Sequence, residues 1–226
     1  GRYGLGSKDT TPKDIAAVFD NLKYKNSKNG FTIGINDDLT YTSLNTNKKF
    51  EITPKGLISC KFWGLGSDGT VGSNKQAIKI IGNNTKMHVQ AYFDYDSKKS
   101  GGLTVSHLRF GHKPIKSSYL INHADYVACQ NQSYVNKYDI VDDLKTGGVF
   151  VINCSWSDEE LNEKLPASYK KQIAEKNINL YTIDAVDIAR EIGLGNRINM
   201  IMQGAFFKLL NVLPEDVFIK ELKDAV

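Results

Sequence analysis

From residue 57 onwards, short apolar segments alternate with longer stretches whose apolar residues recur at helical spacing. Strands separated by helices predict right-handed crossovers and a mainly parallel sheet. The expected fold class is therefore α/β, with a Rossmann-like sheet covered by helices on both faces in three layers. The expected strands are 57–63, 87–94, 103–108, 125–130, 148–154 and 178–183, and the expected helices are 70–82, 132–138, 157–163, 166–176, 184–192, 198–211 and 214–225.

One of these strands carries the strongest burial signal. Residues 149–152 (Val-Phe-Val-Ile) are apolar at four consecutive positions. A strand with helices on both faces has no solvent-facing side, so its sequence does not alternate. We expect this strand to be a fully buried central strand.

The first 30 residues have a different character. Residues 1–9 have the composition of a linker, and Thr11-Pro12 with Asp14 opens a helix as an N-cap, a first-position proline and an acid in the first turn. Ile15, Val18, Phe19 and Leu22 fall on one face of that helix. We expect an interdomain linker and leading helix over 1–30, and the α/β domain over 31–226.

Composition excludes several classes of protein. Apolar residues make up 41% of the 226, charged residues make up 24%, and no apolar run approaches the ~20 residues that span a bilayer. A net charge of +4 is too mild to indicate nucleic acid by itself. The N-terminus has no apolar signal core and no initiating Met, so we expect a fragment of a longer cytoplasmic protein that contacts neither membrane nor nucleic acid.

The three cysteines are Cys60, Cys129 and Cys154, each in an expected strand or at its end. Without a C-x-x-C pair they predict neither a zinc site nor an iron–sulfur site, and the histidines show no metal-ligand spacing. We expect reduced, buried cysteines and no metal in this chain.

A glycine-rich turn follows the first expected strand of the sheet. Gly64, Gly66 and Gly69 fit G-x-G-x-x-G between a strand and a helix that begins near Thr70. Glycine allows positive φ and close approach of backbone amides, and a helix N-terminus favours phosphate. The alternative is a tight turn with no ligand.

Several other segments are expected at the same edge of the sheet, because ligands of α/β sheets bind beyond the carboxyl ends of the strands. Residues 97–124 contain no acid but do contain Lys98, Lys99 and Arg109, which form either a positive rim for an anionic ligand or a solvated basic face. The segments expected to converge there are 64–69, 94–102, 107–112, 130–133 and 153–157.

The ligand class and the chemistry are less well defined. A dinucleotide site expects an acid ~20 residues after the turn, whereas Asp94 and Asp96 come later and are followed by two lysines, which favour a ligand with additional phosphate. The sequence has no nucleophile elbow, H-E-x-x-H or G-K-[ST] motif, so no catalytic residue is assigned.

The same residues carry a resemblance to a known family. Blocks at 1–5, 34–40, 64–72, 95–101, 106–111 and 197–203 follow one another as in pyruvate:ferredoxin (flavodoxin) oxidoreductases, and the region is similar to the gamma domain of 2-oxoacid:acceptor oxidoreductases. The resemblance implies a domain that binds coenzyme A, a substrate, and covers the active site.

The resemblance also implies site residues and partners. The residues that would meet coenzyme A are Gly66, Ser67, Asp68, Gly69, Thr70, Val71, Ser97, Lys98, Lys99, Ser100 and Arg109. Thiamine diphosphate and [4Fe-4S] clusters are expected in other domains of the same polypeptide, and ferredoxin or flavodoxin is the implied electron acceptor. The alternatives are a free-standing NAD-dependent dehydrogenase and a purely structural interdomain module.

Overall fold

The computed structural model describes residues 1–4, 9–37, 39–46, 50–96, 101–195 and 197–224. They form two compact units. Unit 1 consists of Gly1–Lys55 with Lys116–Leu120, and unit 2 consists of Gly56–Ile115 with Ile121–Val226. The domain boundary expected after residue 30 stays a prediction.

Unit 1 is small. It contains β1 (Arg2–Tyr3), α1 (Pro12–Leu22) and β2 (Thr32–Ile33), and the two strands pair in parallel. The predicted start of α1 is confirmed, with the Thr11 N–H donating to the Asp14 carboxylate at 2.9 Å. Arg2–Tyr3, which we expected to be linker, is a strand because its backbone pairs with β2.

Unit 2 is built on a six-stranded sheet of order β4-β5-β3-β6-β7-β8. Neighbours among β3, β6, β7 and β8 pair in parallel, while β5 runs antiparallel to both β3 and β4. The prediction of a mainly parallel sheet is confirmed. The strands are β3 (Ile58–Leu65), β4 (His88–Tyr95), β5 (Leu103–Gly111), β6 (Ala124–Cys129), β7 (Leu144–Asn153) and β8 (Asn179–Ile183).

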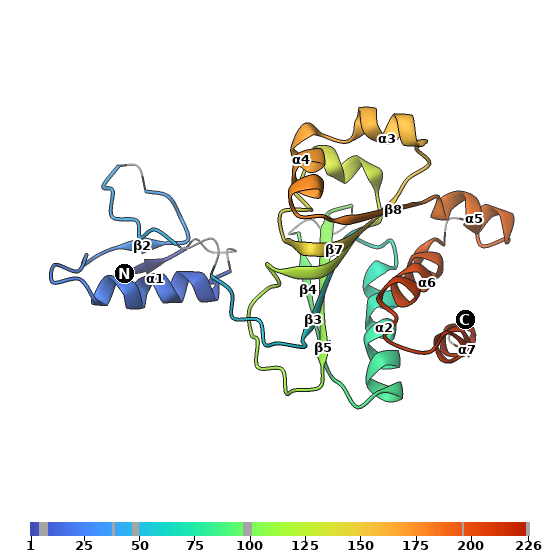
Figure 1. The fold of residues 1–226 in the computed structure, drawn as a ribbon, viewed down its shortest axis with the longest axis horizontal. Helices are drawn as coiled ribbons and strands as arrows, with labels where there is room; N and C mark the ends of the chain where they lie inside the picture. The colour runs from blue at the N-terminus through green and yellow to red at the C-terminus, as the bar shows by residue number, and fades with distance from the viewer. Residues whose placement is uncertain (5–8, 38, 47–49, 97–100, 196, 225–226) are drawn as a thin grey trace. The chain divides into compact units, whose positions relative to one another are not determined.

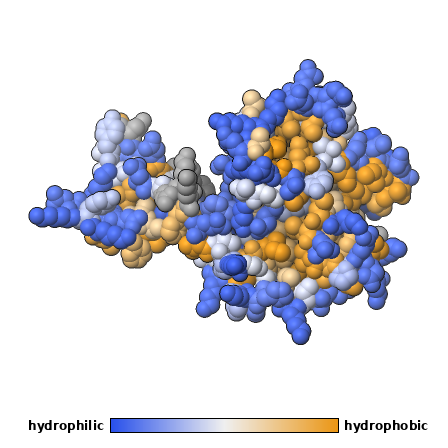
Figure 2. Space-filling view, viewed as in Figure 1, coloured by the Kyte–Doolittle hydropathy of each residue, from blue (hydrophilic) through white to orange (hydrophobic). Residues whose placement is uncertain are grey.

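Helices cover both faces of this sheet, as expected for three layers (Figure 1). Side chains of α2, α6 and α7 pack into one apolar core, and those of η1, α3 and α4 pack into a second core on the opposite face. The helices are α2 (Thr70–Asn84), α3 (Asp158–Lys164), α4 (Ala167–Glu175), α5 (Ala185–Glu191), α6 (Asn199–Leu210) and α7 (Glu215–Asp224), with the short 3₁₀ helix η1 (Gln132–Asn136). In the view of Figure 2, hydrophilic residues lie along the outer edge of the region around α3 and α4, and hydrophobic residues show between them.

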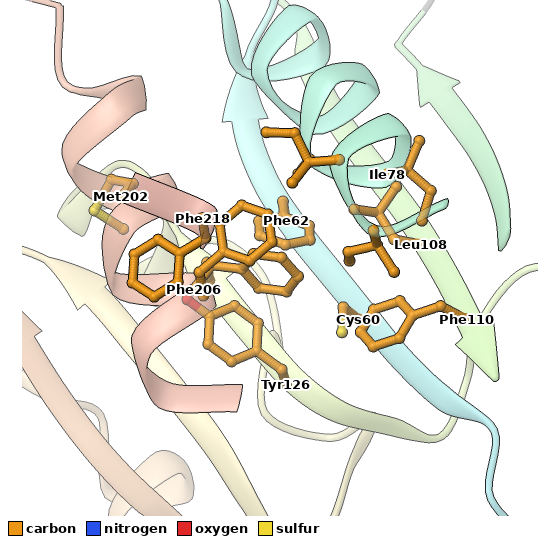
Figure 3. Close-up of a cluster of buried hydrophobic side chains, with 14 of the residues drawn as sticks. Cys60, Phe62, Ile78, Leu108, Phe110, Tyr126, Met202, Phe206 and Phe218 are labelled. Atoms are coloured by element: carbon orange, nitrogen blue, oxygen red, sulfur yellow. The ribbon is translucent and has the colours of Figure 1, made fainter. Parts of the chain in front are cut away.

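An aromatic cluster joins α6 to the sheet (Figure 3). The ring of Phe206 lies 5.2 Å from that of Phe62 on β3 and 5.3 Å from that of Tyr126 on β6. Phe206 also contacts Phe207, 5.1 Å away, and is itself fully buried. The cluster fixes where α6 lies across the sheet.

The strand with the strongest burial signal separates the two cores, with Val151 in the first and Phe150 and Ile152 in the second. These three residues are at most 1% exposed, whereas Val149 is half-buried. β7 lies between β6 and the edge strand β8, so it is a largely buried interior strand and not the fully buried central strand that we expected. All three cysteines are free and buried, as predicted.

We expect Phe206→Ala to lower the free energy of unfolding of the chain by about 3–5 kcal/mol, because it empties the centre of the aromatic cluster. Urea denaturation measures this. Tyr126→Phe is the matched control. The buried Tyr126 hydroxyl has no hydrogen-bond partner among the described residues, so this change should leave stability equal or higher. A loss below 1 kcal/mol for Phe206→Ala would contradict the central role of this ring.

Candidate functional site

The glycine-rich turn joins the carboxyl end of β3 to the N-terminus of α2. The helix begins at Thr70, as predicted, and Ser67 and Gly69 have positive φ angles of 73° and 88°. The Asp68 carboxylate accepts hydrogen bonds from the N–H of Leu65 at 2.8 Å and from the N–H of Thr70 at 2.7 Å. One side chain thus ties the end of the strand to the start of the helix.

Packing of the turn leaves little room for a side chain at its three glycines. A Cβ on Gly64 would lie 2.7 Å from Thr70 Oγ1, and one on Gly66 would lie 3.2 Å from the Gly102 carbonyl oxygen. A Cβ on Gly69 would lie 2.6 Å from Nδ2 of Asn199. These glycines are therefore explained by close approach within the protein, with or without a ligand.

The first turn of α6 holds the glycine-rich turn in place. Asn199 donates from Nδ2 to the Asp68 carbonyl at 2.6 Å and accepts from the Thr70 hydroxyl at 3.4 Å. One helical turn later, Gln203 donates to the Ser73 carbonyl at 3.2 Å. Sequence reasoning assigned no role to this pair. The signal was two amide side chains at i and i+4 on a helix that is otherwise apolar up to Lys208.

A hollow of about 630 Å³ opens beside the turn. It lies where β3 and β4 end and β5 begins, and five of the predicted site residues line it, namely Gly66, Ser67, Asp68, Gly69 and Val71. The remaining lining residues are Leu65, Tyr95, Asp96, Gly102, Leu103 and Thr104. The predicted Ser97, Lys98, Lys99 and Ser100 lie outside the described residues, but Asp96 and Gly102 on either side of them line the hollow.

Only some amides of this turn are available to a ligand. Gly66 N–H donates to the Gly102 carbonyl at 2.7 Å, Asp68 N–H to the Leu65 carbonyl at 3.0 Å, and Thr70 N–H to Asp68. The amides of Val71 and Gly72, in the first turn of α2, have no partner within the helix. Two unpaired amide donors at the N-terminus of a helix are the usual arrangement for binding an anion.

Asp68 has a structural role in the turn. Its carboxylate accepts from two backbone amides, and its own N–H is already bonded. A negative charge at this position stabilises the helix N-terminus but repels an anionic ligand. Its predicted contact with phosphate has no donor to support it.

Arg109 lies away from the hollow. Strand β5 starts at Leu103 beside the turn and runs antiparallel, which places Arg109 opposite Ser59 on β3 and Gln90 on β4. At ~3.4 Å per residue, Arg109 is about 20 Å along the strand from Leu103. The predicted convergence of 107–112 on the rim is therefore wrong, because β5 ends at the opposite edge. Arg109 is 4% exposed and donates to Oε1 of Gln90 at 2.9 Å.

His107 is also internal rather than part of a basic surface. It is 3% exposed, and its Nδ1 accepts from the Ile121 N–H at 3.2 Å. Burial, with the nearby cations of Lys61 and Arg109, lowers the pKa of His107 to about 3. Lys61, its cross-strand neighbour on β3, forms an ion pair with Asp143.

A second hollow, of about 470 Å³, lies at the carboxyl ends of β6, β7 and β8. Gln130, Asn131, Gln132 and Asn153 line it with Cys154 and Ser155, so the predicted segments 130–133 and 153–157 do converge. The side chains of Asn131 and Asn153 already have structural roles. Asn153 donates to the Gln130 carbonyl at 3.0 Å and accepts from the Ala185 N–H at 3.0 Å.

The two hollows flank the point where the chain connections diverge. From β3 the chain passes through α2 to β4 on one side, and from β6 it continues to β7 and β8 on the other, while β3 and β6 pair in parallel. Ligands of α/β sheets bind at such switch points. Within the described residues, no cluster of three His, Cys, Asp or Glu side chains is placed to hold a metal ion, and no helix is long and apolar enough to cross a membrane.

Comparison with known proteins assigns the family. Residues 59–226 match the family model described as pyruvate ferredoxin/flavodoxin oxidoreductase. The chain belongs to this family. It is 58% identical over its whole length to the pyruvate:ferredoxin oxidoreductase of Moorella thermoacetica and 58% identical to the pyruvate-flavodoxin oxidoreductase of Klebsiella pneumoniae. It spans 19% of the length of each of these oxidoreductases.

Solved structures agree on the fold of this oxidoreductase domain. The pyruvate oxidoreductase subunit PORC of Thermotoga maritima superposes with a TM-score of 0.59 at 18% identity, covering 76% of this chain and 86% of that subunit. The 2-oxoglutarate:ferredoxin oxidoreductase of Magnetococcus marinus, solved with 2-oxoglutarate, coenzyme A and succinyl-CoA bound, superposes with a TM-score of 0.58 at 20% identity, covering 76% of this chain and 27% of its own. At these identities the likeness shows the α/β fold of a gamma subunit.

We expect Gly69→Ala and Gly72→Ala to change stability in opposite directions. Gly69 has a φ of 88°, and an added Cβ would meet Asn199, so Gly69→Ala should cost at least about 1–2 kcal/mol. Gly72 has no atom within 4 Å of its Cβ position and lies in α2, so Gly72→Ala should gain up to about 1 kcal/mol. Urea denaturation of both variants measures the difference, and equal effects would refute the proposed packing of the turn.

The buried neutral His107 predicts a loss of stability in acid. Its pKa is about 3 in the folded chain and near 6.5 when unfolded, so the unfolded state binds the extra proton between these values. Stability should fall by roughly 1.4 kcal/mol for each pH unit below about 6.5. His107→Asn keeps an acceptor but does not titrate, so its stability difference from the unmodified chain should shrink as the pH falls to 4.5. His112→Asn, at an exposed position, is the control. If the stability difference between His107→Asn and the unmodified chain did not change with pH, the assignment of this acid effect to His107 would be wrong.

Proposed function

We propose that this chain is the coenzyme A-binding domain of a pyruvate:ferredoxin (flavodoxin) oxidoreductase and covers its active site. The observation that carries the proposal is the hollow at the N-terminus of α2. Residues on both sides of Lys98 and Lys99 line it, and the first-turn amides of Val71 and Gly72 have no partner within the helix. Backbone donors and two ammonium groups suit a ligand with several phosphates.

The residues that we propose for the phosphates are fewer than the sequence indicated. Ser67 contributes its hydroxyl, Val71 and Gly72 their amides, and Lys98 and Lys99 their charges. Gly66 and Gly69 shape the turn, and Asp68 and Thr70 hold it together through the hydrogen bond between them. Arg109, at the other end of β5, is left out.

The proposed oxidation of pyruvate takes place elsewhere in the longer polypeptide. There pyruvate and coenzyme A would give acetyl-CoA and carbon dioxide, with two electrons passed to ferredoxin or flavodoxin. The residues of this chain do not fit the cofactors of that reaction. Its three cysteines are buried singly on β3, at the end of β6 and just after β7, which does not form the ligand set of an iron–sulfur cluster. No motif for thiamine diphosphate occurs in the sequence, so we propose that the fragment alone is inactive.

Two observations support coenzyme A over NAD. The Magnetococcus marinus relative in fold was solved with coenzyme A bound. In addition, the late acids Asp94 and Asp96 are followed by two lysines, which favour the extra 3′-phosphate of coenzyme A. A structural interdomain module is the second candidate, because packing alone explains the three glycines.

The double variant Lys98→Ala/Lys99→Ala tests the proposal. We expect about tenfold weaker binding of coenzyme A, or about 1.4 kcal/mol, by calorimetry on the longer enzyme. The double variant should weaken the binding of 3′-dephospho-coenzyme A by a smaller factor if one of the lysines contacts the 3′-phosphate. Lys170→Ala/Lys171→Ala, a consecutive pair on α4, is the matched control and should bind normally.

Three outcomes separate the candidates. Unchanged coenzyme A binding in Lys98→Ala/Lys99→Ala would exclude the lysine role. Thermal stabilisation by millimolar NAD but not by coenzyme A would favour a dehydrogenase, since a ligand stabilises the state that it binds. A structural module would show neither response, and changes in the glycine turn would leave the KM for coenzyme A unaltered.

A further inference from the structure

Helix α1 of unit 1 turns a largely polar face inward. Its buried residues are Asp14, Ala17 and Asn21. Asp14 accepts from the Thr11 N–H and hydroxyl at 2.9 and 2.7 Å, and Asn21 exchanges two hydrogen bonds with the backbone of Lys28 at 2.9 and 3.0 Å. Short polar side chains therefore fix this face of the helix to its own connecting segments.

The same helix exposes its large apolar side chains. Ile15 is 41% exposed, Phe19 is 63% exposed and Leu22 is 66% exposed. Their i, i+4, i+7 spacing aligns them in one stripe, about 130° around the helix from the buried side. Apolar side chains come to the surface along α1 in Figure 2. A surface helix normally presents the reverse arrangement, with apolar residues inward.

Unit 1 also lacks a core of ordinary size. Among its described residues, the buried apolar side chains are Ala17, Phe31 and Ile33, with Val18 and Leu44 packed partly against them. Its sheet consists of two strands of two residues each. This small apolar core does not offset the conformational entropy that a segment of this length loses on folding. Unit 1 therefore needs a further surface to pack against.

The comparisons show what accompanies unit 1 in its relatives. The family model begins at residue 59, so it leaves out residues 1–55 of unit 1. The long oxidoreductases of Moorella thermoacetica and Klebsiella pneumoniae nevertheless match the whole chain at 58% identity, and the chain is 19% of their length. Unit 1 thus occurs together with a much longer polypeptide.

We infer that the α1 stripe, defined as Ile15, Phe19 and Leu22, is a docking surface for an apolar face of the same long polypeptide outside residues 1–226. Tethering in one chain makes such an association intramolecular, so a small apolar patch suffices for stable contact. The stripe is therefore an internal domain interface of the long enzyme.

Hydrogen exchange of the α1 amides tests the inference. The exchange of residues 12–22 is compared between the 226-residue chain and the complete long polypeptide, each at two protein concentrations. We expect exchange at least tenfold slower in the long polypeptide, independent of concentration. Coenzyme A does not enter this readout, so failure of the proposed function would leave the result unaffected.

Variants in the long polypeptide assign the protection to the stripe. Phe19→Ser/Leu22→Ser should restore the fast exchange of the 226-residue chain. Asp20→Ser, on an exposed side of α1 away from the stripe, should keep the slow exchange. Equally slow exchange in both proteins would place unit 2 on the stripe, and slowing only at high concentration would place a second copy there. Either result, or fast exchange in both proteins, would overturn the inference.

Discussion

The contact between the first turn of α6 and the turn from β3 to α2 organises the proposed binding edge. Asn199 bonds both the Asp68 carbonyl and the Thr70 hydroxyl, while the Asp68 carboxylate bridges the end of the strand and the start of the helix. The aromatic cluster around Phe206 holds α6 at the position from which Asn199 reaches the turn. The shape of the hollow thus depends on a helix more than a hundred residues away in the sequence.

The elements of unit 2 could be predicted from sequence because their signals are local. Four consecutive apolar residues indicated the buried strand β7, and a glycine-rich turn followed by helical spacing indicated the start of α2 at Thr70. The place and direction of β5 could not be obtained in this way. That strand lies between β3 and β4 through pairings that no local pattern specifies, and its reversal moves Arg109 to the far edge.

The side chains of the site also divide into those that a local sequence pattern reveals and those whose role depends on the three-dimensional structure. Residues 66–71 could be proposed because they overlap a glycine motif and belong to a block that resembles a known family, but the role of the Asp68 carboxylate depends on which amides face it in three dimensions. Asn199 and Gln203 were missed because their partners belong to α2 and the preceding turn. The sequence of α1 likewise places Ile15, Phe19 and Leu22 on one face, but it does not say that this face points outward.

The packing around the glycines determines whether sequence similarity at these positions is evidence for a shared ligand or only for a shared fold. If Gly64, Gly66 and Gly69 are required by contacts with Thr70, Gly102 and Asn199, relatives will share them to keep the turn, whatever they bind. Similarity at these positions is therefore evidence for the fold. Evidence for a ligand has to come from groups that packing does not need. In this chain those are the amides of Val71 and Gly72, which take no part in the bonds that hold the turn, and, in our proposal, the charges of Lys98 and Lys99.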